Sequence, residues 1–168
     1  MPHCPCTRIR ETATNLPSPH GRIIFTAIAL TLAGGCGSGP AAEPSKEVTT
    51  SGSVEVTARL EEIRGTPPVT KLYRYAFIMK YRVLRVHRGK VEGDEILVAH
   101  YEPLKPRAEA GDKWSGPVGG NVVRLSVGEV HRMALEPTMD AYMGAIIDPY
   151  FSQPGARHWA VWTEYGAE

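Results

Sequence analysis

Cysteine is scarce in this chain of 168 residues, and its positions exclude two kinds of site. The three cysteines are Cys4, Cys6 and Cys36, so residues 37–168 contain none. A disulfide framework and a thiolate-bound metal are therefore excluded within that part of the chain. Cys4 and Cys6 could form a metal or redox pair, but their spacing and the lack of downstream partners make that the weaker interpretation.

An excess of positive charge is also missing. The chain has 19 basic and 18 acidic residues, and three of the basic residues and one acidic residue precede Cys36. From Cys36 onward this leaves 16 basic and 17 acidic residues, a net charge of −1. Phosphate neutralisation supplies most of the affinity of a general nucleic-acid binder, which therefore needs a basic domain. We accordingly expect no nucleic-acid partner.

Familiar catalytic motifs are absent too. The sequence has no G-x-S-x-G, no P-loop, no G-x-G-x-x-G and no H-E-x-x-H. Those patterns position a nucleophile, a phosphate, a dinucleotide and a zinc ion. Ser115 and Ser126 have no neighbouring pattern that would activate a hydroxyl. The sequence therefore favours a non-enzymatic protein that carries no cofactor.

The apolar run of residues 23–33 is too short to cross a bilayer, because it has 11 residues and a membrane-spanning helix needs roughly 20. Arg22 precedes the run and small residues follow it up to Cys36, which is the anatomy of an export signal. The small residues before Cys36 resemble the lipobox of bacterial lipoproteins. Ala33 stands where that motif usually has leucine, and Leu32 lies one position earlier.

The lipobox resemblance implies that residues 1–35 are a signal peptide and that Cys36 becomes a diacylated membrane anchor. It places the mature protein in a bacterial cell envelope, and Gly37 favours the outer membrane, facing the periplasm or the cell surface. A secretory signal with a coincidental cysteine and a buried core helix are the alternatives. Residues 37–52 hold one valine and no aromatic residue, so we predict a disordered tether there and a folded domain at 53–168.

Alternating apolar residues predict strands from residue 53 onward. The first strand runs through residues 54–61, and a second, aromatic-rich strand covers residues 73–86. The apolar phase of the second strand slips by one residue at Leu84, which predicts a β-bulge that bends it. A glycine-rich hairpin at residues 87–94 leads to a third strand at 95–101.

The second half of the domain has weaker patterns. Residues 102–120 are rich in proline and glycine and predict a long loop, followed by a short strand at 122–125. Further strands are predicted at residues 130–135 and 158–162, with a helical turn or two at 141–147. Five main strands joined by connections too short for parallel crossovers predict an all-β protein with a small antiparallel barrel.

The strand pattern from Tyr75 to His100, with the sequence Val83-Leu84-Arg85-Val86 and then residues 95–98, resembles small exported bacterial domains. Those domains have the oligonucleotide/oligosaccharide-binding (OB) barrel in its netrin-module, metalloproteinase-inhibitor-like form. The resemblance covers about residues 53–165 and implies an OB-like barrel. It does not imply protease inhibition, because that activity needs a free N-terminal cysteine and Cys36 would be acylated.

Two sets of residues are candidates for partner binding. Lys80 and Arg82 belong to a stretch, residues 70–90, with seven basic residues and no acidic one, which could attract anionic glycans or lipid headgroups. A solvated outer strand face is the alternative interpretation. His100 and Tyr101 end a strand beside the long loop, and Trp114 within that loop could stack on a sugar or pack against a protein.

These observations predict an envelope lipoprotein with a small non-enzymatic barrel that binds a protein or glycan partner. The alternative is a metal-dependent hydrolase or transferase centred on His100, since histidines converging with an aspartate could bind zinc. None of the four domain histidines shows metal-ligand spacing, so no metal site is predicted.

Overall fold

The structure is a computed structural model that describes residues 43–139, 142 and 144–168. The predicted signal peptide and Cys36 lie outside these residues. The described part contains seven strands and two short helices. In chain order they are α1 (Lys46–Thr50), β1 (Val54–Glu62), β2 (Tyr75–Arg88), β3 (Glu95–Tyr101), α2 (Arg107–Ala110), β4 (Gly119–Gly120), β5 (Val130–Glu136), β6 (Ala145–Ile147) and β7 (Arg157–Tyr165). Neither helix is long and apolar enough to cross a membrane.

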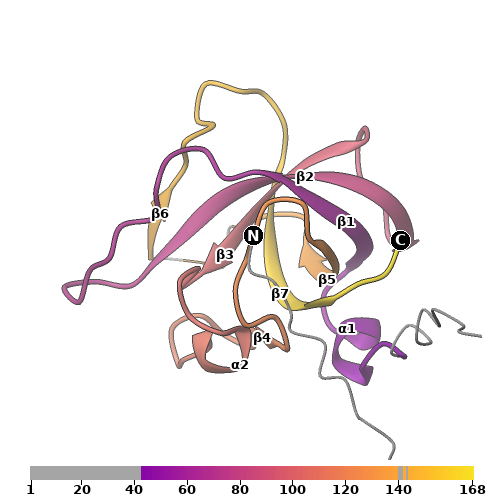
Figure 1. Ribbon diagram of the computed structural model, residues 1–168, viewed down its shortest axis with the longest axis horizontal. Helices are drawn as coiled ribbons and strands as arrows, with labels where there is room; N and C mark the ends of the chain where they lie inside the picture. The colour runs from indigo at the N-terminus through magenta and orange to yellow at the C-terminus, as the bar shows by residue number, and fades with distance from the viewer. Residues whose placement is uncertain (1–42, 140–141, 143) are drawn as a thin grey trace, which may run out of the picture. The chain divides into compact units, whose positions relative to one another are not determined.

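Five of the strands close into a barrel (Figure 1). Their order is β1-β5-β7-β3-β2, and β2 pairs again with β1 to complete the circle. The predicted five-stranded, OB-like, all-β barrel is therefore confirmed. One detail differs, because β3 and β7 pair in parallel. The prediction considered only the short connections between successive strands, whereas residues 102–156, which include β5, form a connection long enough for a parallel crossover.

The bend of β2 was predicted and is present. Alternate residues of β1 and β2 point into the barrel, as their apolar pattern indicates. Thr57 of β1 pairs with Arg85 of β2, but the next residue, Ala58, pairs with Val83. Leu84 is therefore an extra residue in β2. A second shift leaves an extra residue at His87. These two bulges bend the 14-residue strand around the barrel.

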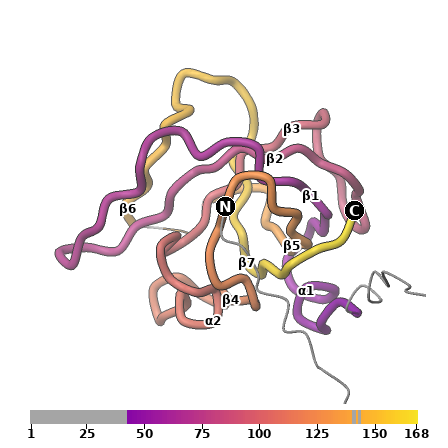
Figure 2. The backbone as a smooth tube through the Cα atoms, viewed as in Figure 1, coloured from indigo at the N-terminus to yellow at the C-terminus, as the bar shows by residue number. Residues whose placement is uncertain are grey.

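Two apolar clusters hold the fold together. The first fills the barrel with inward residues such as Leu60, Phe77 and Met133. The second lies on the opposite face of β2, β3 and β7, where the long loops cover Ile78, Tyr101 and Trp159 among others. Because both faces of β3 are covered, all of its residues after Glu95 are buried. Figure 2 shows α2 and its neighbouring loop on one side of the barrel and the β1–β2 loop projecting beside β6.

The ordered domain begins earlier than predicted. Residues 46–50 form α1, with the side chain of Val48 fully buried and Ser45 capping the helix. The Arg88 guanidinium donates to the backbone carbonyls of Thr49, Ser51 and Gly52. The prediction of a disordered tether up to residue 52 is therefore wrong for residues 45–52. Composition counts apolar residues within the segment and misses a long-range anchor such as Arg88.

Two further local predictions are wrong. Residues 122–125 form no strand, and Gly119–Gly120 pair with β7 instead. A Cβ atom at Gly119 would overlap the Trp162 ring, so only glycine allows this approach. Within residues 141–147, predicted as helical, Ala145–Ile147 form β6 in parallel with β2. Residues 140, 141 and 143 lie outside the described part.

Candidate functional site

The site begins at Asp112, whose carboxylate organises the loop after α2. Oδ1 accepts hydrogen bonds from the backbone N–H groups of Trp114 (2.8 Å) and Ser115 (2.9 Å). The Ser115 hydroxyl in turn accepts from the Asp112 N–H at 2.9 Å. An aspartate that binds the backbone two and three residues ahead makes a rigid turn. We call residues 111–117 the Trp114 loop.

The other oxygen of Asp112 ties the Trp114 loop to two neighbouring elements. Oδ2 accepts from the Tyr101 hydroxyl at 3.0 Å and from the Arg74 guanidinium at the end of the β1–β2 loop. Burial opposes ionisation of Asp112, but these donors and the two backbone N–H groups outweigh it and lower the pKa of the carboxyl. Asp112 is therefore a stable anion that holds three segments of the chain together.

Tyr101 lies beneath this loop and supports it. Its side chain is 1% exposed, and its ring packs edge-on against Tyr142 and beside Trp159, with ring centroids 5.7 and 6.2 Å away. Tyr142 and Trp159 stack on each other at 4.5 Å. Burial first, and then the bond to Asp112, raise the pKa of Tyr101 to about 12. Tyr101 is a neutral hydrogen-bond donor at any physiological pH.

Trp114 is the exposed residue of this supported loop. Its side chain is 72% exposed, although its backbone is fixed by Asp112, and Lys113 Nζ lies 4.7 Å above the ring. Arg74 ties the end of the β1–β2 loop to Asp112, and within that loop Leu72 and Val69 are more than 90% exposed and Tyr73 is half exposed. We call Val69, Leu72, Tyr73 and Trp114 the loop surface.

Of the residues predicted as partner-binding, Trp114 is exposed on this loop. Tyr101 is buried beneath the loop, so the prediction that it contacts a partner is wrong, and Lys80, Arg82 and His100 lie elsewhere. His100 lies inside the barrel with no exposed surface, so the prediction that it opens to a partner is wrong. The reason is strand alternation. Tyr101 points to the covered outer face of β3, so its neighbour His100 must point into the barrel.

His100 belongs to a buried polar chain in the barrel. The Tyr81 hydroxyl lies 2.9 Å from His100 Nε2 and 3.3 Å from His131 Nδ1. His131 Nε2 lies 3.3 Å from a Glu129 carboxylate oxygen at the edge of the barrel. Burial, and then the positive charge of Arg107, hold the pKa of His100 well below its usual value. His100 is therefore neutral in the folded protein.

The metal-dependent alternative receives no support from this arrangement. Among residues 43–139, 142 and 144–168, no three histidine, cysteine, aspartate or glutamate side chains gather as a metal site would require. His100 is also sealed from solvent by the surrounding core.

Lys80 and Arg82 are neutralised by their neighbours. The Lys80 ammonium lies 3.5 Å from Glu62 and 3.9 Å from Glu95. Arg82 pairs with Glu61 of β1 and lies 3.4 Å from Asp94 and 3.7 Å from Glu95. The stretch 70–90 has no acidic residue of its own, but β1, β3 and the hairpin before β3 supply acidic side chains that pair with it. The geometry agrees with the solvated outer face that was the alternative interpretation.

Sequence reasoning missed Asp112 and Arg74. A turn signal in residues 112–116 could have identified the loop, because Asp112, Ser115 and Gly116 are all of types that favour turns. The pairing of Arg74 with Asp112, 38 residues apart, left no such signal.

Comparison with known proteins adds no family to this description. No family model matches the chain, and no curated protein and no solved structure matches it.

Proposed function

We propose that this protein is an envelope lipoprotein, anchored through Cys36, whose barrel binds a partner protein at the loop surface without catalysing a reaction. The observation that carries the proposal is the exposure of Trp114 on a backbone that Asp112 holds rigid. Because its backbone is already held, Trp114 would lose little backbone entropy on binding, and exposed aromatic residues often dominate interface energetics.

The neighbouring residues favour a protein partner over a glycan. Leu72 and Val69 are almost completely exposed and offer no hydrogen-bond groups for sugar hydroxyls. One face of the Trp114 ring is covered by Lys113, which leaves less of the ring for stacking. Exposed apolar side chains next to an aromatic one are typical of protein-binding surfaces.

A membrane anchor at Cys36 would suit the same role. Cys36 precedes Ser45, the residue that caps α1, by nine positions. A chain of that length spans at most roughly 30 Å, so the anchor would keep the barrel close to the bilayer and raise its effective concentration for a membrane partner.

Co-purification tests the proposal. The lipid-anchored chain is recovered from native membranes as wild type and as Trp114→Ala, and the proteins retained are quantified. Loss of a central aromatic residue costs an interface about 2 kcal/mol, so we expect roughly thirtyfold weaker retention of a specific protein. Val127→Ala, which changes an apolar residue with 59% exposure away from the loop surface, is the matched control.

Three outcomes would contradict the proposal. Equal retention by Trp114→Ala and Val127→Ala would reject the loop surface. Retention of a glycan instead of a protein would reject the partner class. Equal fatty-acid labelling of wild type and Cys36→Ser would reject the anchor and leave the loop surface to be judged by the first comparison.

A further inference from the structure

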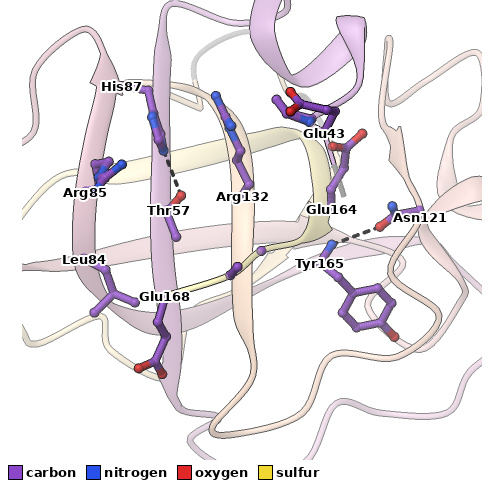
Figure 3. A pocket seen from close by; sticks show the side chains of 13 residues that line it. Glu43, Thr57, Leu84, Arg85, His87, Asn121, Arg132, Glu164, Tyr165 and Glu168 are labelled. Atoms are coloured by element: carbon purple, nitrogen blue, oxygen red, sulfur yellow. Dashed lines mark hydrogen bonds between the residues drawn. The ribbon is translucent and has the colours of Figure 1, made fainter. Parts of the chain in front are cut away.

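A second candidate site lies apart from the loop surface, in a pocket of about 530 Å³. It is bordered by β1, β2, β5 and β7 and by the segments next to both described chain ends (Figure 3). Its volume falls in the range of small-molecule sites. Thr57 lies within the pocket, and charged side chains line its two sides.

One side of the pocket carries two arginines and a histidine, and burial and then the charge of Arg132 lower the pKa of that histidine, His87. Arg85 and His87 come from the bulged part of β2, and Arg132 comes from β5. Arg85 makes no ion pair with any residue that the structure describes. Arg132 binds Glu55 through Nε at 2.8 Å and Nη2 at 2.5 Å, which leaves its Nη1 for another acceptor. His87 Nε2 lies 2.8 Å from the Thr57 hydroxyl, so its Nδ1 edge is the one left for a ligand.

The opposite side is acidic. Figure 3 shows Glu43 and Glu164 across the pocket from Arg85 and His87. Glu164 is only 6% exposed, and its oxygens accept from the Trp162 indole at 2.9 Å and from the Ser45 N–H at 3.1 Å. No cationic side chain in the described part of the chain lies within ion-pair distance of it. Each of these oxygens keeps a lone pair, so Glu164 can still accept a hydrogen bond from a ligand ammonium.

We propose that this pocket binds a small zwitterion with a phosphate at one end and a primary ammonium at the other, the chemistry of phosphoethanolamine. Arginine side chains match phosphate oxygens in pairs, and Arg85 and Arg132 supply donors on one side. Glu164 receives the ammonium on the other. A simple anion would meet Glu43 and Glu164, and a simple cation would meet the two arginines, so each half alone binds more weakly than the zwitterion.

Calorimetric titration of the full chain in non-ionic detergent tests the proposal with three probes: phosphoethanolamine, inorganic phosphate and ethanolamine. We expect phosphoethanolamine to bind at least about tenfold more tightly than either half, since a charge-assisted contact is lost with each. Arg85→Gln should weaken phosphoethanolamine about tenfold. Arg124→Gln, a change at another exposed arginine outside the pocket, should leave binding unchanged.

Glu164→Gln separates the two halves of the site. It should abolish the preference for phosphoethanolamine over phosphate while phosphate binds at least as well as before. The thermal unfolding midpoint of each variant shows whether it folds, and Arg85→Gln tests the proposal even if Glu164→Gln does not fold. A short-chain phosphatidylethanolamine distinguishes the source of the ligand. Tighter binding than phosphoethanolamine identifies a lipid headgroup, and equal binding identifies the free compound.

Three results would overturn the proposal: no saturable binding of phosphoethanolamine, equal binding of phosphate and phosphoethanolamine by the wild type, or equal effects of Arg85→Gln and Arg124→Gln. None of them depends on Cys36 or on Trp114, so the pocket and the loop surface are tested independently.

Discussion

Similar side chains have different roles on the two faces of β3. On the inner face, His100 and His131 share the Tyr81 hydroxyl, and this polar chain is enclosed by the barrel core. On the outer face, Tyr101 donates to Asp112, and that carboxylate holds the exposed Trp114. A buried aromatic or histidine residue is therefore not in itself a sign of function. The outer network leads to an aromatic side chain that is 72% exposed, whereas the inner one ends at the partly exposed carboxylate of Glu129.

The largest expected effect comes from removing the outer anchor. Asp112→Ala leaves the Tyr101 hydroxyl and the Ser115 N–H, whose bonds to Asp112 are both partly buried, without their acceptor. Each unsatisfied group costs about 1–3 kcal/mol, so we expect a loss of about 3 kcal/mol in the free energy of unfolding, measured by urea denaturation. Asp112→Asn keeps one carbonyl oxygen and should lose less. Equal losses in the two variants would show that the acceptor does not hold the Trp114 loop.

The inner network should respond to pH instead. Burial keeps the pKa values of His100 and His131 in the folded state below their usual value, although Glu129 partly opposes this for His131. The unfolded chain therefore binds more protons near pH 6, and the stabilisation is complete above about pH 6.5 and lost as pH falls. Each such histidine contributes up to about 1.4 kcal/mol per pH unit.

The pH response can be assigned with one variant and one spectrum. His100→Gln should flatten the dependence of unfolding free energy on pH between 7 and 5.5, values chosen to bracket the ordinary histidine pKa of about 6.5. Nitrogen NMR of the imidazoles reports the charge state directly and should show neutral His100 throughout. A His100 that protonates near pH 6.5 in the folded protein would contradict its enclosure by Tyr81, His131 and Arg107.

The smallest effect on stability and on partner binding is expected from changes on the outer face of β2. Lys80→Gln and Arg82→Gln remove ion pairs between partly exposed side chains, which solvent already screens. Both variants should unfold at nearly the wild-type urea concentration and keep the partner retained by the loop surface. If either variant retained much less of the partner protein, the basic stretch at residues 70–90 would again be a candidate binding site, and the contrast between the two networks would be weaker.

The barrel itself could be predicted because its evidence is local. Alternation in β1 and β2 specified which residues face inward, and the phase slip at Leu84 marked the bulge. The parallel pairing of β3 with β7 had no such signal, because it joins strands whose partners depend on the whole closed sheet. The helix α1 was missed for the same reason, since Arg88 holds it from 36 residues and more along the chain.

The site could be predicted only in part. Trp114 was predicted from its residue type and its place in a long loop, and it is exposed there. Tyr101 was predicted to contact a partner but is buried beneath that loop. His100 was assigned to the wrong environment because neighbouring strand residues point to opposite faces, and the sequence alone did not show which face would open. Lys80 and Arg82 looked unopposed along the chain, whereas their counterions lie on adjacent strands.

Site-specific photo-crosslinking in cells tests the central claim most directly. A photoreactive side chain is placed at Trp114 in the anchored chain and, as a control, at Val123, which is exposed at 64% and lies near Tyr165 rather than Asp112. The account predicts one discrete protein adduct from Trp114, none from Val123, and loss of the adduct when Leu72→Ser is added. No adduct at either position, or the same adducts at both, would contradict it.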